Sequence, residues 1–330
     1  MSEAVRDRVT SFGGRYLNRQ RLAEYVIVAA IVVEAVVFAS IAPQFLSVPN
    51  LVNVALSIAI TGILAVGMTM VILTGGIDLS VGSVVALAGV VAATLASGGD
   101  SGVALGVAAA LGIGLGGGLF NGLVIARFRV PPCVTTLAML TICRGLAFVI
   151  SKGRSIGNLP ESFNFVGRAR VLGVPLPVIL MLLVFAGGWF LLRRTVVGRY
   201  IYAVGGNRRA TFFAGVDTRR VIVITYVLNG LLVGLAGFVL ASRLGAGVPN
   251  SGIQYELDVI AAVVVGGTSL VGGQGSVVGT FWGAVFIGVL NNGLNLFGVD
   301  PYMQKIALGV VLLLAVFADQ AGKTRGADEA

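Results

Sequence analysis

The chain has 330 residues, of which 57% are hydrophobic and only 11% are charged. Soluble globular domains carry about 25% charged residues, so this composition excludes an ordinary soluble domain and predicts a polytopic, all-α membrane protein. The net charge of +9 comes from basic residues clustered in loops between apolar runs, which indicates membrane topology and not nucleic-acid binding.

The first half of the chain predicts five membrane-spanning helices. A basic tail, residues 1–24, precedes the first apolar run and is expected in the cytoplasm because basic residues favour that side. Two glycines in TGGIDLSVGSVVALAG (Thr74–Gly89) break the chain after the second run, and Asp78 or Ser80 can cap the next helix. The five runs are Tyr25–Ala42, Leu51–Leu73, a third that ends near Ser97, Val103–Ala126 and Cys133–Ile150.

The second half predicts five more helices, so that about ten spans place both chain ends in the cytoplasm. The loop Ser151–Pro175 is expected outside, although its four basic residues depart from the usual charge bias. Residues 25–320 then form one transmembrane permease domain, and residues 321–330 form a cytoplasmic tail. The five runs are Leu176–Leu192, Val221–Ala241, Leu257–Leu270, Val277–Phe297 and Tyr302–Phe317.

Two internal likenesses indicate a duplication. LFNGL (Leu119–Leu123) in the fourth run resembles LNNGL (Leu290–Leu294) in the ninth, which crosses in the opposite direction. This pairing predicts an inverted repeat of helices 2–5 and 7–10. GGIDLSVGSVV also resembles GGTSLVGGQGSVV, but that likeness implies a parallel pairing. We prefer the first pairing because it leaves only helices 1 and 6 outside the repeat.

The most polar long stretch between the two halves is Gly198–Arg220, which sets five arginines against one acid, Asp217. Such a segment cannot cross a bilayer, and its basic excess predicts a cytoplasmic position. Its interior, Asn207–Gly215, predicts one short helix that begins at an Asn cap and ends at a Gly. The segment is either a docking surface for a soluble partner or a solvated loop that only joins two helices.

The residue types present argue against nucleotide binding, acid–base catalysis and metal binding by this chain. No nucleotide-binding loop of the form GxxxxGK[ST] occurs, and there is no histidine to serve as general base or metal ligand. The two cysteines, Cys133 and Cys143, are expected to be small hydrophobic residues. We therefore expect no catalytic residue, no cofactor and no metal on this chain, and a transport pathway remains.

Polar side chains inside apolar runs are the candidates for that pathway, because each must find a partner or a polar cavity. The polar set is Thr61, Thr69, Asn121, Arg144, Asn229, Asn291, Asn292 and Asn295. Asparagines can also serve only as hydrogen bonds between helices, Arg144 can extend to the external face, and Asp78 can be a helix cap. The residues selected for the pathway are Asp78, Asn121, Arg144, Asn229 and Asn292.

Several long stretches resemble the permeases of sugar-type ABC transporters, the ribose/xylose/arabinose/galactose family. The resemblance covers about residues 25–320. The matching stretches are ILTGGIDLSVGSVVALAG (Ile72–Gly89), GLFNGLVIARFRVPPCVTTLAML (Gly118–Leu140), RGLAFVISKG (Arg144–Gly153), VVVGGTSLVGGQGSVVGTFWGA (Val263–Ala284) and GVLNNGLNLFGV (Gly288–Val299).

The resemblance implies an importer-type ABC permease in the bacterial inner membrane that works by alternating access. It implies a second copy of the permease, a cytoplasmic ABC ATPase subunit that holds ATP and Mg²⁺, and a periplasmic or lipid-anchored sugar-binding protein, all in contact with membrane lipid. The coupling helix falls on GGNRRATFFAGV, Gly205–Val216, where Arg208, Arg209, Thr211 and Phe212 depart from the family pattern. The implied ATPase-coupling residues are Gly206, Asn207, Ala210, Phe212, Ala214 and Gly215.

Three other functions remain open from the sequence. The first is a permease of the same superfamily for a nucleoside, an inositol, a branched-chain amino acid or another small solute. The second is an ion-coupled secondary transporter with helices broken at Gly75–Gly76 and Gly266–Gly267. The third is a structural or signalling membrane protein. A separate subunit with two nucleotide-binding domains would distinguish the ABC permeases from the others.

Overall fold

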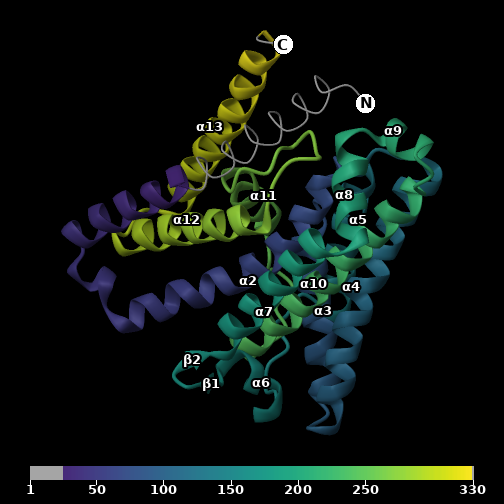
Figure 1. Ribbon diagram of the computed structural model, residues 1–330. Helices are drawn as coiled ribbons and strands as arrows, with labels where there is room; N and C mark the ends of the chain where they lie inside the picture. The colour runs from purple at the N-terminus through teal and green to yellow at the C-terminus, as the bar shows by residue number, and fades with distance from the viewer. Residues whose placement is uncertain (1–24, 329–330) are drawn as a thin grey trace.

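The computed structural model describes residues 25–328, with side chains as far as Phe317. Its centre is helix α10 (Thr218–Leu244), which packs along α4 (Ser101–Phe128), α2 (Val48–Leu73) and α3 (Val81–Ala96) (Figure 1). The other helices are α5 (Pro132–Ser151), α6 (Glu161–Arg168), α7 (Leu176–Arg194), α8 (Val196–Gly206), α9 (Arg208–Phe213), α11 (Tyr255–Val265), α12 (Val277–Leu296) and α13 (Pro301–Asp328). A 3₁₀ turn η1 (Pro43–Leu46) precedes α2, and strands β1 (Arg170–Val171) and β2 (Val174–Pro175) pair antiparallel.

Six helices in the described part of the chain are long and apolar enough to cross a membrane, namely α2, α4, α5, α7, α10 and α12. Three further predicted runs form shorter apolar helices at Tyr25–Ile41, Val81–Ala96 and Pro301–Phe317. The prediction of an all-helical, multi-pass membrane protein is therefore supported. The count of ten spans and the inverted repeat remain predictions.

One predicted boundary is wrong. The run expected over Leu257–Leu270 is helical only as α11, because paired glycines follow Val265 and Gly267, Gly272 and Gly273 adopt positive φ. The stretch Gly198–Arg220, called the central segment below, contains the predicted short helix as α9, and most of a further helix, α8, precedes it; the two meet at Asn207. The backbone of α13 continues as a helix to Asp328, and the cytoplasmic position of residues 321–330 stays a prediction.

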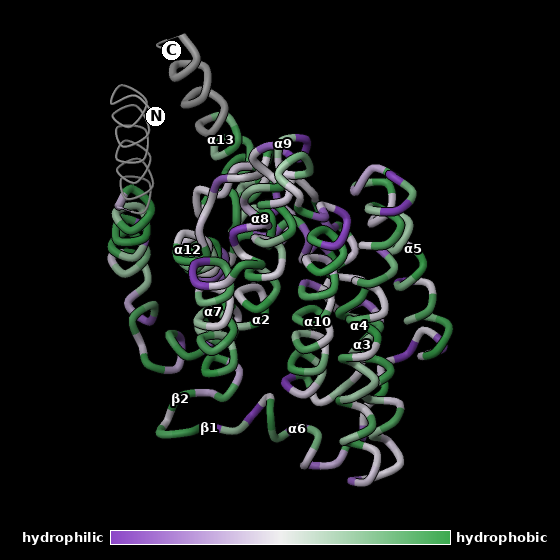
Figure 2. The backbone as a smooth tube through the Cα atoms, turned by 45° about the vertical axis from the view of Figure 1, so that its right-hand side comes forward, coloured by the Kyte–Doolittle hydropathy of each residue, from purple (hydrophilic) through white to green (hydrophobic). Residues whose placement is uncertain are grey.

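The polar ends of the bundle lie far apart. Figure 2 shows α9 at one end of the molecule and α6 with β1 and β2 at the other, while the apolar middles of the helices lie between them. The loop at 151–175 and the central segment thus lie at opposite ends of the molecule, and their positions on opposite sides of a membrane stay a prediction. Which end faces the cytoplasm stays a prediction, and the tail at residues 1–24 lies outside the described residues.

Glycines bring α4 and α10 unusually close. A Cβ atom on Gly118 of α4 would overlap the carbonyl oxygen of Tyr226, and one on Gly230 of α10 would overlap the carbonyl oxygen of Gly114. Small residues allow such backbone approach between helices in lipid. The close approach places Asn121 of α4 and Asn229 of α10 at the glycine break between α2 and α3.

Candidate functional site

A buried polar cluster occupies this first break. The carboxylate of Asp78 is only 3% exposed. Its Oδ1 atom accepts hydrogen bonds from the Ser80 backbone N–H, at 2.9 Å, and from the Ser80 hydroxyl. Its Oδ2 atom accepts one from Nδ2 of Asn229 at 2.8 Å, while Nδ2 of Asn121 donates to the Ser80 hydroxyl at 3.2 Å. Two long helices, α4 and α10, therefore hold the start of α3.

The cluster differs in one detail from the expected helix cap. Ser80 occupies the N-cap position of α3, but its side chain accepts no capping hydrogen bond. The Asp78 side chain instead lies just before the helix, at the positive end of the helix dipole. The Oδ1 atoms of Asn121 and Asn229 are buried and accept no hydrogen bond from the described residues.

The other two expected pathway residues lie outside this cluster. Arg144 of α5 donates to the carbonyl oxygen of Ser251 at 2.8 Å and also to that of Pro249, so it holds the loop between α10 and α11. Asn292 of α12 exchanges two hydrogen bonds of 2.9 Å with Asn50 at the start of α2. The structure therefore brings together three of the five predicted residues.

The second glycine break, between α11 and α12, packs on the first. The backbone N–H of Gly273 donates to the carbonyl oxygen of Leu73 at 2.9 Å. Helix α8 closes over both breaks, since a Cβ on Gly205 would overlap the Leu73 carbonyl oxygen, and the Tyr202 hydroxyl donates to the Gly275 carbonyl oxygen at 2.9 Å. The central segment is thus in direct contact with both breaks.

Helix α9 has the ends that the sequence predicts. The Asn207 side chain caps it by accepting from the Ala210 N–H at 2.9 Å, and Gly215, at φ 86°, follows its end. The hydroxyl of Thr211 donates to the Ala203 carbonyl oxygen at 2.8 Å and fastens α9 to α8. The six expected coupling residues are all exposed, namely Gly206, Asn207, Ala210, Phe212, Ala214 and Gly215.

Two aromatic side chains of α9, Phe212 and Phe213, are exposed. Phe212 is 62% exposed and Phe213 is 84% exposed, and their rings are in edge contact with centroids 6.0 Å apart. Exposed neighbouring aromatic side chains are typical of protein interfaces and of membrane interfaces. The exposure of this pair is consistent with contact to a protein partner and with contact to the membrane interface.

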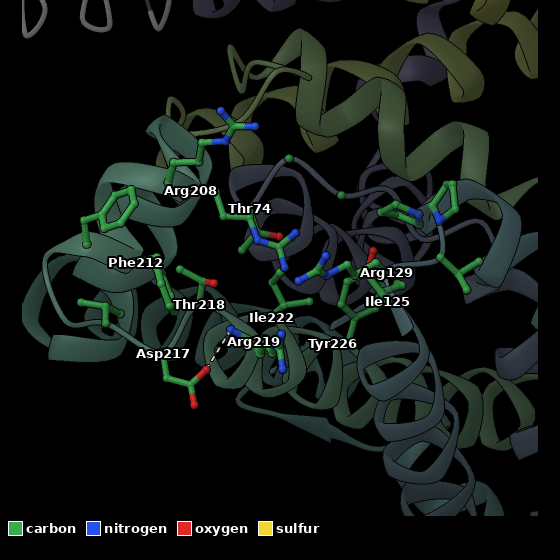
Figure 3. A pocket seen from close by; sticks show the side chains of 18 of the residues that line it. Thr74, Ile125, Arg129, Arg208, Phe212, Asp217, Thr218, Arg219, Ile222 and Tyr226 are labelled. Atoms are coloured by element: carbon green, nitrogen blue, oxygen red, sulfur yellow. Dashed lines mark hydrogen bonds between the residues drawn. The ribbon is translucent and has the colours of Figure 1, made fainter. Parts of the chain in front are cut away.

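Beside α9 lies a basic cavity of about 1370 Å³, lined also by the end of α4, the start of α10 and the first break (Figure 3). Arg129, Arg208 and Arg219 gather around it. Burial, followed by the charges of Arg129 and Arg219, lowers the pKa of the Arg208 guanidinium below its ordinary value. Unbalanced like charges at a cavity favour an anionic partner.

A second cavity, of about 410 Å³, is called the amide cavity below. It lies between α2, α11, α12 and α13, which pack on one another. The residues that line it include Ser57, Thr61, Arg243, Gln254, Tyr255, Asp258, Asn291, Asn292, Asn295, Gln304 and Lys305. Asn292 thus lines the amide cavity and is not part of the polar cluster around Asp78.

Sequence reasoning missed two parts of these sites. It did not single out Tyr202, which joins α8 to the second break, or the pair Asp258 and Lys305 in the amide cavity. The glycine pairs Gly205–Gly206 and Gly272–Gly273 could have indicated the contact between α8 and the second break. Paired glycines in apolar surroundings often mark a close contact between backbones. No local sequence pattern indicates the pair Asp258 and Lys305, because the two residues come from separate helices.

Six apolar helices, two broken segments and a polar segment at one end define a multi-pass helical membrane protein. A family model described as "Branched-chain amino acid transport system / permease component" matches residues 50–316. The chain belongs to this family, and it is therefore a transport component and not an enzyme.

Relatives match nearly the whole chain. It is 44% identical over 314 residues to the ribose import permease protein RbsC of Escherichia coli (strain K12), covering 94% of this chain and 98% of that protein. It is 49% identical over 281 residues to the RbsC protein of Bacillus subtilis (strain 168), covering 84% and 87%. It is 41% identical over 296 residues to the L-arabinose transport system permease protein AraH of Escherichia coli (strain K12), covering 88% and 89%. No solved structure matches the chain.

Proposed function

We propose that this chain is the membrane permease subunit of an ABC importer for a monosaccharide, a pentose such as ribose or arabinose or a related hexose. The identity to ribose and L-arabinose permeases over most of the chain supports the substrate class. A separate cytoplasmic ATPase subunit binds ATP and Mg²⁺, and a periplasmic or lipid-anchored binding protein delivers the sugar.

One observation carries the mechanism: helix α8 contacts both glycine breaks while α9, fastened to it, presents exposed aromatic rings. An ATPase that docks on α9 and moves it would displace α8 together with the two breaks. The breaks interrupt α2–α3 and α11–α12, so their movement would change which end of the pathway is open. Packed helices that have two alternative arrangements can convert a small shift at one end into a large change of conformation.

The arginines around the basic cavity supply the second contact for this partner. Arg129, Arg208 and Arg219 face the space beside α9, so an acidic surface on the ATPase subunit is the complementary partner. Residues 198–220 together form the coupling segment, which we place in the cytoplasm with both chain ends.

The pathway uses the polar groups at both ends of the bundle. The Asp78 cluster with Asn121 and Asn229 holds the first break, and Arg144 and Asn292 hold elements at the other end. The exposed apolar faces of α5 and α13, with Leu137, Val149 and Leu313 among their side chains, contact lipid or a second copy of the permease. A homodimer with about ten spans and an inverted repeat completes the proposed architecture in the inner membrane.

The family description favours a second candidate, a permease for branched-chain amino acids. The test is uptake by proteoliposomes that contain the chain, its ATPase subunit and its binding protein. We expect D-ribose or L-arabinose uptake that needs ATP, and no uptake of L-leucine. Uptake of leucine alone would establish the second candidate, and sustained sugar uptake on an ion gradient without the ATPase would establish a secondary transporter.

A further inference from the structure

The amide cavity carries polar side chains where lipid-facing helices normally have none. It contains about 410 Å³ of space, within the range of roughly 300–1,000 Å³ that is usual for small-molecule sites. Asn291 and Asn295 stand one helical turn apart on α12, so both face the same side. That side is turned toward α13, where Gln304 lies.

Hydrogen bonds fix most of these amides in place. Nε2 of Gln304 donates to Oδ1 of Asn295 at 3.0 Å and to the Val299 carbonyl oxygen at 2.9 Å. Asn292 is tied to Asn50. These hydrogen bonds hold the amides of Asn292, Asn295 and Gln304 in fixed positions at the cavity.

Asn291 is different. Its half-buried side chain lines the cavity but forms no hydrogen bond with a described residue. Its amide atoms are not among the buried polar atoms that lack a partner, so they are accessible to water or to a ligand in the cavity. Packing between helices therefore does not account for this residue.

One acidic and two basic residues line the cavity, namely Asp258, Lys305 and Arg243. Asp258 of α11 and Lys305 of α13 interact electrostatically, although they do not form an ion pair within 4.0 Å in the described residues. Arg243 is occupied by a 2.9 Å hydrogen bond from its Nη1 to the Leu56 carbonyl oxygen. The half-buried ring of Tyr255 adds an apolar wall.

We propose that the amide cavity is a monosaccharide-binding site of the permease itself, with Asn291 as the side chain that hydrogen-bonds the sugar hydroxyls. The inference rests on the proposed function and adds a recognition site within the membrane subunit. A hydroxyl group donates and accepts at once, and an amide offers a donor and an acceptor to match it. The Asp258 carboxylate accepts from a pair of neighbouring sugar hydroxyls.

A transport experiment tests the role of Asn291. In proteoliposomes with the ATPase subunit and the binding protein, Asn291→Leu is expected to lower D-ribose moved per ATP about tenfold, because the sugar hydroxyl loses its partner. Asn53→Leu is the matched control, since Asn53 is exposed on α2 and does not line the cavity. Equal ribose transport per ATP by both variants would overturn the inference.

A labelling experiment tests occupancy with Asn291 intact. Ser57 lines the cavity, and Cys133 is exposed whereas Cys143 is buried, so a Ser57→Cys, Cys133→Ser chain in nanodiscs offers one accessible thiol. Millimolar D-ribose is expected to slow maleimide labelling, and adding Asn291→Leu is expected to remove the protection. L-Leucine at the same concentration is expected to give none.

The two proposals fail in different ways. If wild-type proteoliposomes transport leucine and not ribose or arabinose, the proposed function is wrong. If they transport ribose but ribose gives no protection at Ser57→Cys, the permease does not bind sugar in this cavity and only the further inference is wrong.

Discussion

Asn229 of α10 donates a hydrogen bond of 2.8 Å to the carboxylate of Asp78, which lies 151 residues earlier in the chain. Asn229 is fully buried and Asp78 nearly so. Space for the amide comes from Gly67 of α2, where a Cβ atom would overlap Oδ1 of Asn229. The bond ties the first break to the helix that follows the coupling segment.

Removing this donor should destabilise the protein. In Asn229→Ala, the buried Oδ2 atom of Asp78 loses its partner, which costs about 1–3 kcal/mol. We expect a lower midpoint of thermal unfolding in detergent than for the wild type. The exposed Asn53→Ala is the control and should unfold with the wild type; a midpoint for Asn229→Ala equal to that of the control contradicts the prediction.

Two glycines of α4 should respond in opposite ways to the same change. A Cβ atom on Gly118 would lie 3.1 Å from the Cα atom of Gly230 and closer still to the Tyr226 carbonyl oxygen, whereas one on Gly116 would meet nothing within 4 Å. We expect Gly118→Ala to destabilise by about 1–3 kcal/mol through overpacking, and Gly116→Ala to be neutral or stabilising. Thermal unfolding of the two variants side by side measures this difference, and its absence would contradict the close helix packing.

The exposed ring of Phe212 should be needed for ATPase coupling. Phe212→Ala should lower ATP-driven sugar uptake at least about tenfold, since aromatic anchors dominate interfaces, and should leave thermal stability unchanged. Phe165→Ala is a matched control because Phe165 is equally exposed, at 62%, but lies on α6 at the other end. If both variants transport alike, α9 does not provide the docking contact.

The two ends of the bundle should be accessible from opposite sides of the membrane. Ser155 follows α5 and Phe213 ends α9, and both are exposed. In a Cys133→Ser background, a membrane-impermeant maleimide should label Ser155→Cys on intact cells and Phe213→Cys only after lysis. The reverse pattern would invert the topology that the basic residues predict.

The sequence by itself determined the protein class and most helix boundaries. Apolar runs of about 20 residues cross lipid as helices, because a helix satisfies every backbone hydrogen bond within its own segment. The cap at Asn207 and the glycine after α9 were also predictable, because capping depends on residues within one turn. The end of α11 was not predicted, although Gly266 and Gly267 follow Val265 directly, because neighbouring glycines also lie inside long helices of this chain, as at residues 116–118 of α4.

Only the tertiary structure decided which polar residues meet. Asp78, Asn121 and Asn229 form one cluster because α4 and α10 cross at glycines, while Arg144 holds a loop and Asn291 faces a cavity. In sequence these side chains look alike, each a polar group in an apolar run. Hydropathy is a local property, whereas the partner of a side chain depends on how distant helices pack.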